Sequence, residues 1–171
     1  MSLGLFSFDG PALTSLRLAP LVASTAFITG VLDQQIAFST FAEALSGGRQ
    51  PANETLPLWL YNYTWRVIWV CGTAYPATIA LLGLNLLVDP ADTMSTQTKQ
   101  LYTVGFVLTV IHCFPYQYAA RVRKALWTNQ GKVSDVSSAM AYFAGLNGPR
   151  LWVLDVPAWF FIFAAVVSQF G

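Results

Sequence analysis

Charged residues are scarce in this chain, and their scarcity limits the kinds of protein it can be. Asp, Glu, Lys and Arg together make up 10% of its 171 residues, whereas 55% are hydrophobic. A soluble domain carries about 25% charged residues. The length would suit one soluble domain, but the missing charge indicates that lipid is the solvent.

Cysteine and histidine are also few. The two cysteines, Cys71 and Cys113, form no CxxC pair, so the sequence lacks the usual signature of a zinc knuckle or a thiol redox motif. Both suit a role as small apolar side chains. The single histidine, His112, belongs to no HxxxH or ExxH pattern, so no spacing in the chain predicts a metal site.

What the sequence does contain is four long apolar runs. Each has about 20 residues, which as a helix spans a hydrocarbon layer of roughly 30 Å. Asn147 suits the N-cap of the last helix, and Pro149 suits its first turn. We therefore predict an all-α integral membrane protein, a four-transmembrane-helix bundle in one domain (1–171), with spans at 16–38, 65–87, 101–120 and 151–170.

Basic residues predict the orientation of the spans. Four spans place both termini and the 88–100 loop on one side, which has two Lys or Arg residues. The 39–64 and 121–150 loops, with their span boundaries, have seven. The positive-inside rule places this second side in the cytoplasm and the termini in the lumen of an endomembrane such as the endoplasmic reticulum. The glycosylation sequons at Asn53 and Asn62 indicate the opposite orientation.

Three titratable residues lie deep inside the predicted spans: Asp33, His112 and Asp155. A charge within hydrocarbon costs about 2.5–3.5 kcal/mol, so such residues usually mark a function. Counted at 1.5 Å per residue, all three lie roughly 6–12 Å below the same membrane face. We therefore expect three different helices to bring an acid or a base to one layer, where the side chains meet.

Three interpretations of this predicted cluster are open. In a structural one, arginines pair with the two carboxylates and His112 bonds a backbone carbonyl freed by a proline. In a catalytic one, His112 is a general base in a proton-transfer pocket, and Asp33 and Asp155 tune it. In the third, the same three side chains hold a metal ion on one face.

Three segments follow the pattern of a known family. WRVIWVCGTAYPATIALLGL (65–84) has an aromatic and basic start followed by Gly and Pro, and LYTVGFVLTVIHCFPYQYAARVRKAL (101–126) ends in Pro and a basic exit. In LNGPRLWVLDVPAWFFIFAAVVS (146–168), Asn and Arg stand one turn apart before the apolar run. With these features the chain resembles the anthrone-oxygenase-like family, small four-span membrane proteins of fungal aromatic polyketide pathways.

The resemblance implies an enzyme that oxidises a lipophilic aromatic polyketide, of the anthrone to anthraquinone type, with dioxygen as co-substrate and no cofactor. His112 would deprotonate the substrate, and Asp33 or Asp155 would orient the imidazole. Arginines would stabilise the enolate, and aromatic rings would stack on the substrate. The expected substrate-binding residues are Arg66, Arg121, Arg150, Asn147, Trp65, Trp69, Tyr116 and Trp159.

Two other functions stay open. An oxygen-independent membrane isomerase or cyclase of a lipophilic natural product needs the same acid–base pocket, and oxygen dependence would separate it. A tetraspan scaffold is the non-enzymatic alternative, although the 39–64 loop is short and lacks the cysteines common in junction proteins. The expected partners are the lipid bilayer and a small lipophilic aromatic substrate, and a homo-oligomer is compatible with the sequence. Nucleic acid is not expected, because the basic residues belong to the membrane boundaries.

Overall fold

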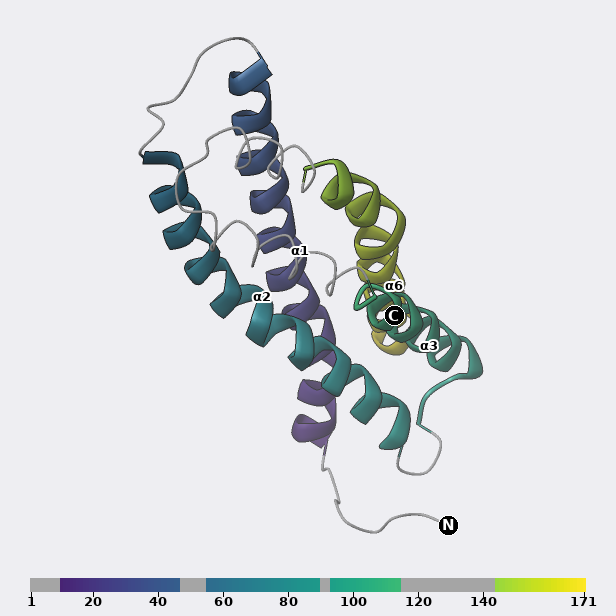
Figure 1. Ribbon diagram of the computed structural model, residues 1–171. Coiled ribbons are helices and arrows are strands. Elements are labelled where there is room, and N and C mark those ends of the chain that lie inside the picture. Colours follow the sequence, from purple (N-terminus) through teal and green to yellow (C-terminus); the bar gives the residue numbers. More distant parts are fainter. Residues whose placement is uncertain (1–9, 47–54, 90–92, 115–143) are drawn as a thin grey trace.

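Four helical segments make up the part of the chain that the computed structural model describes, residues 10–46, 55–89, 93–114 and 144–171 (Figure 1). Within these ranges there is no strand, which confirms the all-α prediction. The elements are α1 (Gly10–Ser46), α2 (Thr55–Leu87), α3 (Thr96–Ile111), and a last helix that runs from 144 through the π-helical turn η2 (Leu151–Asp155) into α6 (Val156–Phe170).

Three of these helices are long and apolar enough to cross a membrane. They are Gly10–Thr40, Trp65–Leu87 and Ala144–Phe170, with 31, 23 and 27 residues. At 1.5 Å per residue, each is at least as long as a hydrocarbon layer of about 30 Å. The predicted run 101–120 begins within α3 and continues into residues outside the described part, so a fourth span stays a prediction.

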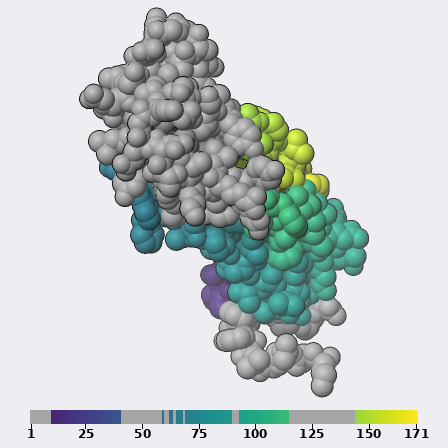
Figure 2. Space-filling view, viewed as in Figure 1, coloured from purple at the N-terminus to yellow at the C-terminus, as the bar shows by residue number. Residues whose placement is uncertain are grey.

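The four segments pack as a ring. α1 contacts α2 and the last helix, and α3 contacts the same two neighbours. Figure 1 shows α1 beside α2 and α3 beside α6, and Figure 2 shows α2 and α3 on one face of the molecule. Gly105 permits the close approach of α3 to α6, because a Cβ there would lie 2.8 Å from Ile162 Cγ1 and 3.4 Å from the Ala158 carbonyl oxygen.

Two hydrophobic clusters fill the ring. The first lies where α2 ends and α3 begins, and its buried members are Leu82, Met94, Tyr102, Ile162, Ala165 and Val166. The second is built on Phe27, Val31 and Leu151, with Tyr75 and Val156 packed against it. Because lipid tails are as apolar as these side chains, close packing and polar contacts hold membrane helices together rather than exclusion from water.

A buried arginine, Arg17, connects three helices beside the first hydrophobic cluster. Its side chain is 2% exposed. Nη1 donates to the Asn85 carbonyl oxygen at 2.9 Å and to Asn85 Oδ1 at 3.1 Å, and Nη2 lies 3.2 Å from Asp89 Oδ1. The Tyr102 hydroxyl donates to the Arg17 carbonyl oxygen at 2.8 Å, and Lys99 Nζ lies 2.9 Å from Asp89 Oδ2. This Arg17 cluster ties the start of α1 to the end of α2 and the start of α3.

The burial of Arg17 differs from the sequence expectation. The orientation count assigned it to an aqueous flank of the first span, whereas in the structure it lies inside the ring. A buried guanidinium needs acceptors, and the carbonyl, amide and carboxylate oxygens of Asn85 and Asp89 supply them. Without Arg17 the count is one basic residue against seven, so the charge difference keeps its direction, and the orientation of the termini stays a prediction.

The Asp89 carboxylate of this cluster makes stability depend on pH. Burial raises the pKa of Asp89, but hydrogen bonds from Lys99, Thr93 and the Met94 N–H outweigh burial and hold it below the ordinary 3.8. Because the pKa is lower in the folded state, the carboxylate stabilises the fold at and above pH 3.8, and this contribution is lost as the pH falls through the lowered pKa.

We expect Asp89→Asn to cost about 1.5–3 kcal/mol at neutral pH, because hydrogen bonds to a charged acceptor are lost. Thermal unfolding in detergent micelles, at neutral pH and in acid, measures the stability of the wild-type protein and of the variant. The wild-type protein should lose more stability in acid than the variant does. Asp33→Asn, at an exposed carboxylate, is the matched control. An equal acid sensitivity of wild type and Asp89→Asn would contradict this assignment.

Candidate functional site

His112 and Asp155 form a buried pair between α3 and the last helix. His112 follows the end of α3 as its C-cap, and Asp155 is the last residue of η2. His112 Nδ1 lies 2.5 Å from Asp155 Oδ1, and the two side chains are 8% and 3% exposed. The carboxylate accepts the Nδ1 hydrogen, so a neutral His112 carries its lone pair on Nε2. The sequence prediction that these two residues meet agrees with this geometry.

Two aromatic rings fix the plane of the imidazole. Phe27 of α1 meets it edge-on with ring centroids 5.0 Å apart, and the Tyr75 ring of α2 lies 4.8 Å away. The Tyr75 hydroxyl donates to the Thr109 carbonyl oxygen at 2.5 Å and lies 3.0 Å from Cys113 Sγ. Among the described residues, no hydrogen bond reaches His112 Nε2. The imidazole is therefore held in place while its second nitrogen is left for another partner.

The π-helical turn η2 explains how a second charge approaches Asp155. Pro157 has no N–H, and the Val156 N–H bonds the Leu151 carbonyl oxygen, five residues back. This wider turn brings residues five apart onto one face. Arg150 Nε accordingly lies 3.7 Å from Asp155 Oδ2. Turns of this kind occur frequently at functional sites.

A line of polar contacts continues from Arg150 towards α1. Arg150 Nη2 donates to Asn147 Oδ1 at 2.6 Å, and Asn147 Nδ2 lies 3.4 Å from Gln34 Oε1. Gln34 Nε2 in turn lies 3.4 Å from Cys71 Sγ. The expected N-cap role of Asn147 is wrong, because the chain is already helical at 144. Sequence reasoning missed Gln34, although a polar residue in a predicted span was the available signal.

Asp33 does not join the pair. It is exposed, and the Tyr63 hydroxyl donates to its Oδ2 at 2.8 Å. α1 faces the pair with Phe27, Val31 and Gln34. At 3.6 residues per turn, Asp33 lies about 200° around the helix from Val31. The sequence prediction compared only the depths of the three residues in the membrane, and Asp33 lies on the other face of α1. The expected three-residue layer is thus incomplete, and within the described residues no three His, Cys, Asp or Glu side chains gather as metal ligands.

The remaining predicted site residues fall into three groups. Trp65, Arg66 and Trp69 are exposed on α2, away from the face on which Tyr75 meets His112. Trp159 of α6 is half-buried, donates from Nε1 to Thr25 Oγ1 at 2.9 Å and stacks on Phe163. Two predicted positions lie outside the described residues: Tyr116 and Arg121.

The fold and the site together define a small helical protein with membrane-length helices and a buried imidazole–carboxylate pair. No family model and no solved structure matches the chain. Epoxidase pydX of an Acremonium species is 30% identical over 152 residues, which cover 88% of this chain and 92% of pydX. Probable epoxidase scpX of Mollisia scopiformis is 29% identical over 153 residues, 90% of this chain and 94% of scpX.

A third relative is the oxaleimides biosynthesis cluster protein N of Penicillium oxalicum, 28% identical over 152 residues, 86% of this chain and 85% of that protein. The chain belongs to the family of these fungal secondary-metabolite cluster proteins, which fits the anthrone-oxygenase-like family. The epoxidase names of its relatives support an oxidative enzyme in general terms.

The pairing of His112 with Asp155 has a thermodynamic consequence. Removing one partner of a buried pair leaves the other uncompensated and costs about 3–5 kcal/mol. We expect His112→Leu and Asp155→Leu each to lower the melting temperature in micelles. The double variant should lose less stability than the two single variants together, with a coupling energy of about 0.5–3 kcal/mol. Combining His112→Leu with Asp33→Leu is the control and should be additive. Additivity of the His112 and Asp155 variants would contradict the pairing.

Proposed function

We propose that this protein is a membrane-embedded oxygenase that oxidises a lipophilic aromatic metabolite with dioxygen, using His112 as the general base. The observation that carries the proposal is the buried pair, with Nδ1 on Asp155 Oδ1 at 2.5 Å and Nε2 without a hydrogen bond to the described residues. The epoxidase names of relatives in fungal clusters support an oxidative reaction. In this proposal α3 completes a fourth span in an endomembrane with lumenal termini.

The pair suits abstraction of a proton from carbon or from a phenol. Nε2 accepts the proton, and the Asp155 carboxylate stabilises the imidazolium that forms and keeps it oriented. The low dielectric around two side chains that are 8% and 3% exposed strengthens this interaction. Arg150, 3.7 Å from Asp155 Oδ2, holds the carboxylate from its other side. Phe27 and Tyr75 keep the ring from turning.

The anthrone to anthraquinone type of reaction balances without another reductant. Deprotonation of the substrate CH₂ gives a carbanion, which transfers electrons to dioxygen. The carbon becomes a carbonyl that keeps one oxygen atom, and the other oxygen leaves as water together with the two hydrogens. All four electrons come from the substrate. The proposal therefore needs neither a metal nor an organic cofactor.

Epoxidation is the second candidate, because three relatives are named epoxidases. An alkene gives up two electrons when it becomes an epoxide, whereas reduction of dioxygen to one water and one bound oxygen needs four. Two electrons and two protons must then come from a phenolic or hydroquinone group that is oxidised in the same reaction. The same base serves both candidates, because a phenolate is the better electron donor.

Oxygen uptake by purified protein given 1,8-dihydroxyanthrone tests the proposal. General acid–base catalysis contributes about 100- to 10,000-fold, so we expect His112→Ala to lower kcat by that factor and Asp155→Asn to lower it less. Thr103→Ala, which removes an exposed hydroxyl of α3 away from the pair, is the control, and its kcat should match the wild type. Full turnover by His112→Ala would contradict the assignment.

A strong chelator added to the same assay separates base chemistry from metal chemistry. We expect uptake to continue unchanged. Abolished uptake that returns with added metal would contradict the cofactor-free form of the proposal. Turnover of a substrate without any oxygen uptake would favour the isomerase alternative.

A further inference from the structure

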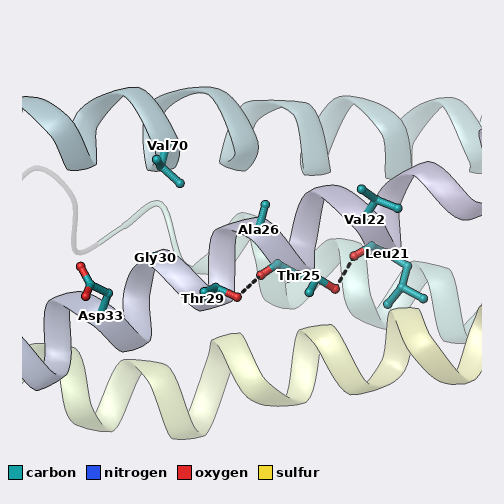
Figure 3. A pocket seen from close by; sticks show the side chains of 8 residues that line it. All are labelled: Leu21, Val22, Thr25, Ala26, Thr29, Gly30, Asp33 and Val70. Atoms are coloured by element: carbon teal, nitrogen blue, oxygen red, sulfur yellow. Dashed lines mark hydrogen bonds between the residues drawn. The ribbon is translucent and has the colours of Figure 1, made fainter.

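A groove runs along the outer side of α1, opposite the face that meets His112. It has a volume of about 840 Å³, which is within the range of small-molecule sites. Figure 3 shows its residues along α1 with Val70 projecting towards them from α2, and the last helix runs on the other side of α1. Its lining is almost entirely apolar, and its residues are Leu21, Val22, Thr25, Ala26, Thr29, Gly30, Asp33 and Val70.

Asp33 gives the groove one charged acceptor. A carboxylate on the outer face of a membrane-length helix is costly and usually has a function. The Tyr63 hydroxyl occupies Oδ2, and among the described residues no hydrogen bond reaches Oδ1. Burial and the bond to Asp33 raise the pKa of the Tyr63 phenol, so it stays a donor to this carboxylate. The free oxygen suits a ligand that donates a hydrogen bond, such as a phenol.

A small cavity lies inside the ring, beside Asp155. Its volume of about 10 Å³ is close to that of one water molecule. Asp155 shares its lining with Ser24, Thr78 and Thr109. Asp155 Oδ2 is buried and has no hydrogen-bond partner among the described residues. An aromatic ligand cannot enter this cavity unless a wall moves.

Trp159 contacts both the cavity and a residue of the groove. Its indole lines the cavity, and its Nε1 donates at 2.9 Å to the hydroxyl of Thr25, which lines the groove. The same indole stacks on Phe163 with centroids 5.5 Å apart and planes at 10°.

We propose that the groove is the membrane-side docking site for a flat lipophilic substrate with a phenolic hydroxyl, and that Trp159 is the gate through which it reaches the pair. Asp33 accepts the phenolic hydrogen while the ring lies on the apolar wall of α1. The Trp159–Thr25 hydrogen bond holds the gate closed. This inference rests on the proposed function of the His112–Asp155 pair, which it extends by naming the route of the substrate.

Binding without turnover tests the docking site. The probe is 1,8-dihydroxyanthraquinone, titrated against the full chain in lipid nanodiscs by quenching of tryptophan fluorescence. Ala26→Trp fills the groove, and we expect it to raise the Kd of the probe about tenfold. Val107→Trp, at an exposed position of α3 outside the groove, is the matched control and should leave Kd unchanged. A Kd that Ala26→Trp leaves at the wild-type value would overturn the docking site.

The gate is tested by rates. Thr25→Val keeps the shape of the side chain and removes the acceptor of the Trp159 N–H. Under anaerobic conditions in deuterated buffer we expect the rate of deuterium exchange at the CH₂ of 1,8-dihydroxyanthrone to rise, while the Kd of the probe in the groove stays constant. An unchanged exchange rate would overturn the gate. Neither measurement involves oxygen. The oxygen uptake of His112→Ala therefore tests the proposed function, whereas the Kd of Ala26→Trp tests the docking site independently.

Discussion

The buried carboxylate of Asp155 is the constraint on which the arrangement around the candidate site depends. Placing such a charge inside an apolar bundle costs several kcal/mol unless a partner compensates it. His112 at the end of α3 is the close partner, at 2.5 Å, and Arg150 stands on the other side of the carboxylate at 3.7 Å. Their pairing fixes the register of α3 against the last helix, and the glycine at 105 allows the two helices to come close enough.

The π-helical turn is part of the same solution. An ordinary α-helical turn through Leu151–Asp155 would place Arg150 and Asp155 on different faces, and Pro157 would leave a carbonyl without its donor. With the Val156 N–H on the Leu151 carbonyl oxygen, the wider turn brings Arg150 towards the carboxylate.

The two polar clusters of the bundle differ in the chemistry of their unbonded atoms. The Nη atoms of Arg17 have backbone, amide, carboxylate and hydroxyl oxygens within 3.5 Å, and Asp89 receives bonds from three neighbours. In the part of the chain that the structure describes, His112 Nε2 and Asp155 Oδ2 have no hydrogen bond. Arg17 Nε is also buried without a hydrogen bond among the described residues. A guanidinium has no lone pair that could accept a proton, whereas the Nε2 of a neutral imidazole does, as a catalytic base requires.

Hydropathy alone predicted the helices well, because a membrane imposes length and apolarity on each span. The meeting of His112 and Asp155 was also predictable, since both lie at a similar depth on helices that proved to be neighbours. Asp33 was misplaced because depth along an axis says nothing about the face of a helix. Arg17, Asn85 and Gln34 were missed, because Arg17 was counted as a flanking charge and neutral polar residues in the spans were passed over. Neither hydropathy nor depth within a span predicts a π-helical turn.

Proton abstraction by His112 is the central claim, and hydrogen–deuterium exchange without oxygen measures it most directly. The wild-type protein in deuterated buffer, kept anaerobic with 1,8-dihydroxyanthrone, should accelerate deuterium incorporation at the substrate CH₂ above the spontaneous rate. His112→Ala should show only the spontaneous rate. Absence of any acceleration by a wild-type preparation that oxidises the same substrate in air would contradict the role of His112 as the base.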